Sequence, residues 1–179
     1  MIKTIKENIV MDNGFVKVYN NTVEFPDNTI GSYYKTTLSD KLPNYGVAGI
    51  AITRDNKIIL MDNYRYAHSD FSIETVKGFG MHNKTALETF KIEMLEEIGF
   101  ESNDVEEVLK LRESNSDYFA HCFVAKNCTS IGKTAHENTE IIENIKEVDF
   151  KEAIRMIKNG NITDPLTIVL IQHVVINIL

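Results

Sequence analysis

Cysteine, tryptophan and proline are scarce in this chain. It has 2 cysteines, 3 prolines and no tryptophan among 179 residues. Two cysteines are too few for a disulfide framework or for a site with two metal-ligand pairs, so we interpret Cys122 and Cys128 as reduced thiols. Reduced thiols are typical of intracellular proteins, and we therefore predict a cytoplasmic location.

A surplus of basic residues is also absent, as is any long apolar run. The formal net charge of −7 argues against a surface that binds duplex nucleic acid. It does not exclude a small anionic substrate, because a bound cation and one or two arginines reverse the sign of the charge locally. We find no signal-peptide pattern and no apolar stretch long enough to cross a membrane, so we expect no membrane partner.

Internal repeats and low-complexity segments are missing too. A chain of 179 residues suits one sizeable core. Short alternating runs near the start predict a small β extension over residues 1–40, and residues 41–179 read as one domain. Within that domain we expect a hairpin of strands at 47–53 and 57–61, further strands at 105–111, 118–125 and 141–148, and helices at 151–158 and from Pro165 onward, with Asp164 as the N-cap.

Acidic residues, by contrast, are concentrated on one short predicted helix. Glu93, Glu96 and Glu97 share a face of a 3.6-residue helix, without a lysine or arginine four residues away. The like-charged pair of Glu93 and Glu97 alone costs about 0.2–0.5 kcal/mol. A hard cation such as Mg²⁺ or Mn²⁺ would turn this repulsion into a binding site. The alternative interpretation is a solvated acidic face.

The residues around these acids predict a loop, a helix and a stop. Residues 81–84 read as a loop, and Thr85 and Glu88 have the spacing of a capping box. Gly99 ends the helix, as a residue that tolerates positive φ. The segment resembles the Nudix box, G-x5-E-x7-R-E-U-x-E-E-x-G-U, where U is bulky and apolar. The matching residues are Gly78, Glu93, Met94, Glu96, Glu97, Gly99 and Phe100.

Two positions depart from that pattern. Lys84 stands where the pattern has its first glutamate, and Ile92 stands where it has arginine. In the family these two residues support each other while the later glutamates hold metal. The departure therefore removes a structural pair, keeps the metal ligands and puts the catalytic rate in question.

The resemblance continues outside the box and narrows to the ADP-ribose pyrophosphatase subfamily. The expected hairpin leads into Asn63-Tyr64-Arg65-Tyr66, which is similar to that subfamily's Q-x-R-Y segment. The segment from Glu74 to Gly78 is similar to its E-L-P-A-G segment, although the proline is missing. The resemblance implies an α/β fold, a Nudix α/β/α sandwich with a mixed sheet, plus a small N-terminal antiparallel sheet.

By resemblance, the function is metal-dependent hydrolysis of the pyrophosphate bond of ADP-ribose or a related nucleotide sugar. Glu93 and Glu97 would bind Mg²⁺ or Mn²⁺, Glu96 a second ion, and the Lys77 carbonyl would be a backbone ligand. The products would be a nucleoside monophosphate and a sugar phosphate. The alternative is a Nudix-fold protein that binds or senses nucleotide sugars with little or no turnover.

Substrate contacts and a general base complete the expected site. Arg65 would clamp a phosphate, with a surface ion pair as the alternative. Glu74 would meet the ribose or a metal-bound water, or cap a turn, and Gly78 would lie beside the substrate. For the base, related enzymes use an acidic loop after the box, which points to Glu137 first and Glu140 second, with a solvated loop acid as the alternative for either.

The first strands and the last helix lead us to expect a homodimer. A sheet built from residues 1–40 is too small to bury its own face. The last helix is apolar around most of its circumference and too short to span a membrane. A two-fold partner would cover both surfaces, as in the subfamily that the chain resembles.

Overall fold

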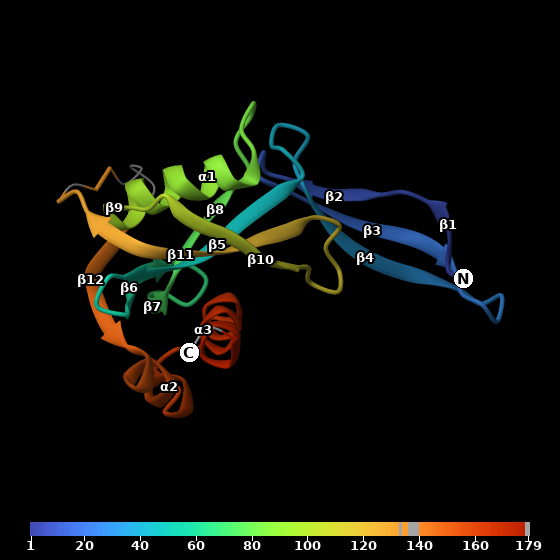
Figure 1. The fold of residues 1–179 in the computed structure, drawn as a ribbon. Helices are drawn as coiled ribbons and strands as arrows, with labels where there is room; N and C mark the ends of the chain where they lie inside the picture. The colour runs from blue at the N-terminus through green and yellow to red at the C-terminus, as the bar shows by residue number, and fades with distance from the viewer. Residues whose placement is uncertain (133, 136–139, 178–179) are drawn as a thin grey trace.

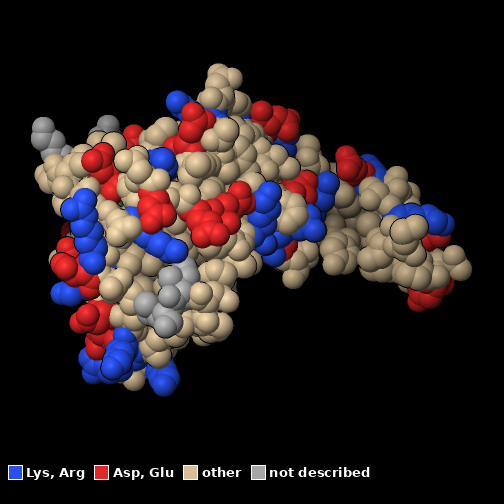
Figure 2. Space-filling model, viewed as in Figure 1, with Lys and Arg blue, Asp and Glu red and all other residues tan. Residues whose placement is uncertain are grey.

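The computed structural model describes residues 1–132, 134, 135 and 140–177, which form two β-sheets and three helical regions. Figure 1 shows an α/β body from which a narrow sheet projects. No helix in the described ranges is both long and apolar enough to cross a membrane. Figure 2 shows acidic and basic side chains interspersed over one face, without a continuous basic surface.

The projecting sheet is antiparallel and four-stranded. Its central strand β3 (Val16–Glu24) pairs with β4 (Ile30–Leu38) along one edge and with β1 (Lys3–Lys6) and β2 (Ile9–Asp12) along the other. Two of the alternating runs near the start of the sequence, at residues 15–19 and 22–25, overlap the single strand β3. The strand continues through the polar residues Asn20 and Asn21 because β4 pairs with every residue from Val16 to Glu24.

The body contains a mixed eight-stranded sheet. Its main order is β10 (Asp104–Leu111), β11 (Phe119–Ser130), β5 (Tyr45–Thr53), β6 (Lys57–Arg65) and β12 (Ile142–Asp149). Strands β11 and β5 run parallel, whereas the other pairs are antiparallel. The short β9 (Phe100–Glu101) pairs with β11.

Strands β5 and β6 separate soon after their hairpin. Their register joins only Ala51 to Ile59 and Ile52 to Ile58. Beyond that point β7 (Asp70–Glu74) pairs with β6, and β8 (Val76–Phe79) pairs with β5. The segment that carries Glu74, Lys77 and Gly78 therefore crosses the sheet where its two central strands diverge.

Helices cover both faces of this sheet, which confirms the predicted sandwich. Helix α1 (Ala86–Glu93) and the π-helical segment η1 (Met94–Ile98) pack on one face, while α2 (Phe150–Lys158) and α3 (Pro165–Asn177) lie on the other (Figure 1). Alternate residues of β5 serve the two cores. Val47 and Ala51 join Phe90 and Met94 on the first side, and Ala48, Ile50 and Ile52 join Leu170 and Val174 on the second.

Candidate active site

The acidic segment is a helix whose geometry changes within the motif. Thr85 caps α1 through a complete capping box with Glu88, and Gly99 ends the segment with φ of 69°, as the sequence predicted. Glu93 is the last residue of α1, whereas Glu96 and Glu97 belong to the π-helical turn. Such turns often mark functional sites. Glu93 and Glu97 line the pocket described below, and Glu96 is half-buried on the same turn without lining that pocket.

Gly78 and Glu93 are in direct contact. A Cβ atom built on Gly78 would lie 2.0 Å from Oε1 of Glu93, so any other residue here would displace the Glu93 carboxylate. The strand before the box thus forms a floor under the first glutamate of the acidic helix. This contact joins two residues that the sequence placed in one motif.

Glu97 is the most buried carboxylate of the segment, with 1% of its surface exposed. Its Oε2 accepts a hydrogen bond of 3.0 Å from the backbone N–H of Lys77. Burial, reinforced by the charges of Glu93 and Glu140, raises the pKa of Glu97 to about 9. A carboxyl with such a pKa holds a proton at neutral pH unless a cation takes the proton's place.

Arg65 and Glu74 form an ion pair behind these acids. Nε of Arg65 lies 3.0 Å from Oε1 of Glu74, and Nη2 of Arg65 lies 2.5 Å from Oε2 of Glu74. The Glu74 side chain is 3% exposed, whereas the Arg65 side chain is 39% exposed and lines the pocket. Burial alone would raise the pKa of Glu74, but Arg65 and Lys77 outweigh burial and lower it.

Lys77 extends this network to the last helix. Its Nζ lies 2.6 Å from Oε2 of Glu74 and 2.8 Å from Oδ1 of Asp164. Oδ2 of Asp164 accepts hydrogen bonds from the backbone N–H and the hydroxyl of Thr167, at 2.8 and 2.7 Å, which confirms Asp164 as the N-cap of α3. No local pattern signals the Lys77–Asp164 contact, because the two residues are 87 positions apart in the chain.

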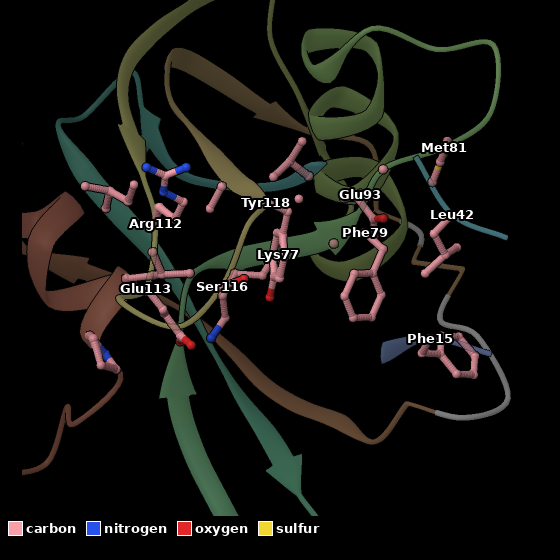
Figure 3. Close-up of a pocket in the computed structure, with 18 of the residues that line it drawn as sticks. Phe15, Leu42, Lys77, Phe79, Met81, Glu93, Arg112, Glu113, Ser116 and Tyr118 are labelled. Carbon is pink, nitrogen blue, oxygen red and sulfur yellow. The ribbon is translucent and has the colours of Figure 1, made fainter. Parts of the chain in front are cut away.

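Arg65, Lys77, Gly78, Glu93 and Glu97 line a cavity of about 590 Å³. Figure 3 shows Phe15, Leu42 and Met81 on one side of it, Arg112, Glu113 and Ser116 on the other, and Lys77, Phe79 and Glu93 between them. The charged members of its described lining are Arg65, Lys77, Arg112, Glu93, Glu97, Glu113 and Glu140. Much of the remaining lining is apolar, including a wall made by the first turns of α3.

Tyr45 supports the loop between the cavity and α1. Its hydroxyl lies 3.2 Å from the carbonyl oxygen of Met81, 2.9 Å from that of Lys84 and 3.0 Å from Oγ1 of Thr89. Lys84 itself is exposed and Ile92 is half-buried. The loop is thus held by a tyrosine that the sequence analysis did not single out, and an aromatic residue at the start of a strand carries no signal of that role.

The donor set suits a hard divalent cation, because Glu93 and Glu97 offer carboxylate oxygens to the same cavity. A bound cation would also neutralise the electrostatic repulsion between Glu97 and its neighbours Glu93 and Glu140. Within the described ranges, however, no three His, Cys, Asp or Glu side chains are grouped closely enough to hold a metal ion as they stand. The ligand set of Glu93, Glu96, Glu97 and the Lys77 carbonyl therefore stays a prediction.

The predicted catalytic and substrate residues are only partly brought together. Arg65, Gly78 and Glu140 line the cavity, whereas Glu74 lies behind it and contacts Arg65 and Lys77. Glu137 falls outside the described residues, so its predicted role as general base has no structural counterpart here. Glu140 is close enough for its charge to raise the pKa of Glu97.

Comparison with known proteins agrees with this architecture. No protein-family model matches the chain. A methanol dehydrogenase activator from Bacillus methanolicus is 27% identical over 174 residues, which cover 96% of this chain and 91% of that protein. The crystal structure of an ADP compounds hydrolase superposes with a TM-score of 0.81 at 16% identity, and the match covers 97% of this chain and 91% of that one. The chain therefore has the fold of that hydrolase, the Nudix sandwich with an added N-terminal antiparallel sheet.

Proposed function

We propose that this protein is a metal-dependent hydrolase of the pyrophosphate bond in ADP-ribose or a related nucleotide sugar. The observation that carries the proposal is the convergence of Glu93, Glu97 and Arg65 on one cavity, with Glu93 seated on Gly78. The products are a nucleoside monophosphate and a sugar phosphate. The likeness to an ADP compounds hydrolase supports the same class of substrate.

Glu93 and Glu97 are the proposed ligands of Mg²⁺ or Mn²⁺, with Glu96 for a second ion and the Lys77 carbonyl as a backbone ligand. When bound, the cation neutralises charge on the phosphates and lowers the pKa of a water molecule. The backbone N–H of Lys77 holds Glu97 in place through Oε2. Because the described charged residues in and behind the cavity include more carboxylates than cationic groups, the site needs added positive charge before it can accept a diphosphate.

Arg65 is the proposed phosphate ligand. Glu74 holds one side of its guanidinium through two hydrogen bonds, which fixes the direction in which the group faces the cavity. Removing a proton from the attacking water falls to an acid of the loop after the box. Glu140 lines the cavity and is one candidate, and Glu137 of the same loop is the other.

Phosphate release from a panel of nucleotide sugars tests this proposal. Each substrate is incubated with the protein with and without Mg²⁺ or Mn²⁺, and an added phosphatase frees phosphate from the products. We expect metal-dependent release from ADP-ribose or a close relative. Metal-independent release, or none from any substrate, contradicts the proposal.

A second candidate function is favoured by the relative that is named as an activator of another enzyme. In this case the chain binds or senses a nucleotide sugar with little turnover and acts on a partner enzyme. The replacement of the box Glu/Arg pair by Lys84 and Ile92 agrees with slow turnover. Tight binding of a panel member by calorimetry without product formation would favour this candidate.

A further inference from the structure

Lys77 contacts three separate parts of the site. Its backbone N–H donates to Glu97 of the acidic helix, and its ammonium group reaches Glu74 at the end of β7 and Asp164 at the start of α3. The side chain is only 16% exposed. Two of the three N–H groups of the ammonium are thus directed at protein carboxylates, so the group binds residues around the cavity rather than open solvent.

The start of α3 is attached to the sheet through polar contacts at this point. Asp164 binds Lys77 on one side and caps Thr167 on the other. Thr167 is fully buried, and its hydroxyl oxygen accepts a hydrogen bond of 3.0 Å from the N–H of Thr75, between β7 and β8. The Lys77–Asp164 pair and the Thr75–Thr167 bond therefore hold the first turn of α3 against β8 and the junction of β7 and β8.

That turn forms a wall of the cavity. Pro165, Leu166 and Val169 line it from α3, and they face the same space as Arg65 and Glu93. An apolar wall does not bind phosphate, so its position decides how much room remains for the group joined to the diphosphate. Lys77 joins this wall to the acidic helix. Its ammonium group lies 2.8 Å from Asp164 at the start of α3, and its backbone N–H is bonded to Glu97.

We propose that Lys77 is a positioning residue that determines substrate specificity by fixing, through Asp164, the α3 wall of the cavity. The inference rests on the proposed function and names the residue pair that selects the group attached to the diphosphate. Since Lys77 acts through the wall, its side chain governs how well the substrate fits rather than the rate of bond cleavage. Its loss raises KM and leaves kcat nearly unchanged.

The test compares Lys77→Met, Asp164→Asn and the double variant with the wild type. Methionine keeps the length of the side chain and the backbone N–H to Glu97, and asparagine keeps the capacity to cap α3. We expect each single change to raise KM for the preferred substrate roughly tenfold, the size of effect that a small misfit in an apolar pocket produces. The kcat should stay within about twofold, and the double variant should be no worse than Lys77→Met, because both single changes remove the Lys77–Asp164 contact.

Amide hydrogen exchange gives a second readout that needs no substrate. Exchange at the N–H groups of Thr167 and Ile168 should quicken in Lys77→Met, since the first turn of α3 loses its tie. Lys77→Arg should recover part of the wild-type KM. Lys151→Met, at an exposed position of α2, is the matched control and should change neither KM nor exchange.

The inference is overturned if the wild type is active and Lys77→Met keeps its KM, if kcat falls as much as kcat/KM, or if α3 exchange is unchanged. Additive effects of the two single changes on KM overturn it as well. A wild-type protein that hydrolyses no member of the panel instead contradicts the proposed function, and this inference then fails with it.

Discussion

At the scale of single residues, the site depends on where two carboxylates are held. Glu93 rests on Gly78, and Glu97 is buried with its Oε2 on the N–H of Lys77. A buried carboxylate with a pKa raised to about 9 is poorly suited to carry charge by itself. A cation beside it removes that difficulty, which is the physical reason to place the metal here.

We predict that Glu97→Gln abolishes Mg²⁺-dependent hydrolysis and leaves the fold intact. A neutral amide is a much weaker ligand for a hard cation than a carboxylate. Phosphate release measures the activity, and circular dichroism checks the fold. Glu106→Gln, at an exposed position of β10, serves as the control and should behave as the wild type. Full activity in Glu97→Gln would show the site to be assigned wrongly.

The two altered positions of the box give a second residue-scale prediction. Ile92→Arg alone should help little or destabilise, whereas Lys84→Glu combined with Ile92→Arg should raise turnover. The reason is that the two side chains act as a pair, so their effects are not additive. Turnover of the two single variants and the double variant is compared with that of the wild type. The coupling is absent if the single changes account for the double one to within about 0.5 kcal/mol.

At the scale of elements, two contacts attach the helices α1 and α3 to the rest of the body. The loop before α1 is held by Tyr45 from β5, and the start of α3 is held by Asp164 and Thr167. Both attachments position one wall of the cavity. Each can be loosened without removing a residue that is proposed to contact the phosphates.

Tyr45→Phe should destabilise the protein by about 0.5–1.5 kcal/mol, the typical net value of one hydrogen bond. It should also lower kcat, because the carbonyl groups of Met81 and Lys84 lose their common donor and the loop before the acidic helix is less well held. Urea unfolding gives the stability and the hydrolysis assay gives kcat. Tyr34→Phe, on the exposed part of β4, provides the comparison. Equal stability of Tyr45→Phe and Tyr34→Phe would rule out this role for the hydroxyl.

The lowered pKa of Asp164 leads to a prediction about how the stability of the protein depends on pH. Burial raises its pKa, but Lys77 and Thr167 outweigh burial and lower it. A carboxyl with a lowered folded-state pKa stabilises the protein above its ordinary pKa of about 4, and this stabilisation is lost as the pH falls further through the folded-state value. Asp164→Asn should therefore be less stable than the wild type at pH 7, with the difference shrinking below about pH 4. Thermal unfolding at several pH values measures this, and a difference that is the same at every pH contradicts it.

At the scale of the whole molecule, the projecting sheet is the least covered part. Many of its apolar side chains are more than half exposed, including Ile5, Ile9, Val10 and Ile30. The final helix needs a partner less than its sequence suggested, since Leu170, Ile171 and Val174 enter the core and Leu166 and Val169 line the cavity. The case for a dimer therefore rests on the N-terminal sheet.

We predict an obligate homodimer in which residues 1–37 pack across the interface and contribute to the neighbouring substrate pocket. Sedimentation equilibrium at micromolar concentration should give twice the chain mass of 20.4 kDa. Ile9→Lys should weaken the dimer by placing a charge in the apolar surface, whereas Ile145→Lys on β12 should not. A folded and active wild-type monomer would show that the sheet has another purpose.

The sequence by itself determined the strand at 47–53 and the start and end of the acidic helix, while the layers of the body came from its resemblance to a known family. The apolar run of β5, the capping box at Thr85 and the stop at Gly99 are local patterns, and the structure confirms each. Only the tertiary structure decided which side chains share the cavity. The contacts of Lys77 with Asp164 and of Tyr45 with the loop before α1 join residues far apart in the chain, and a local pattern does not encode such distances. The π-helical turn is a similar case, because the spacing of Glu93, Glu96 and Glu97 fits an ordinary helix equally well and a local pattern does not distinguish the two.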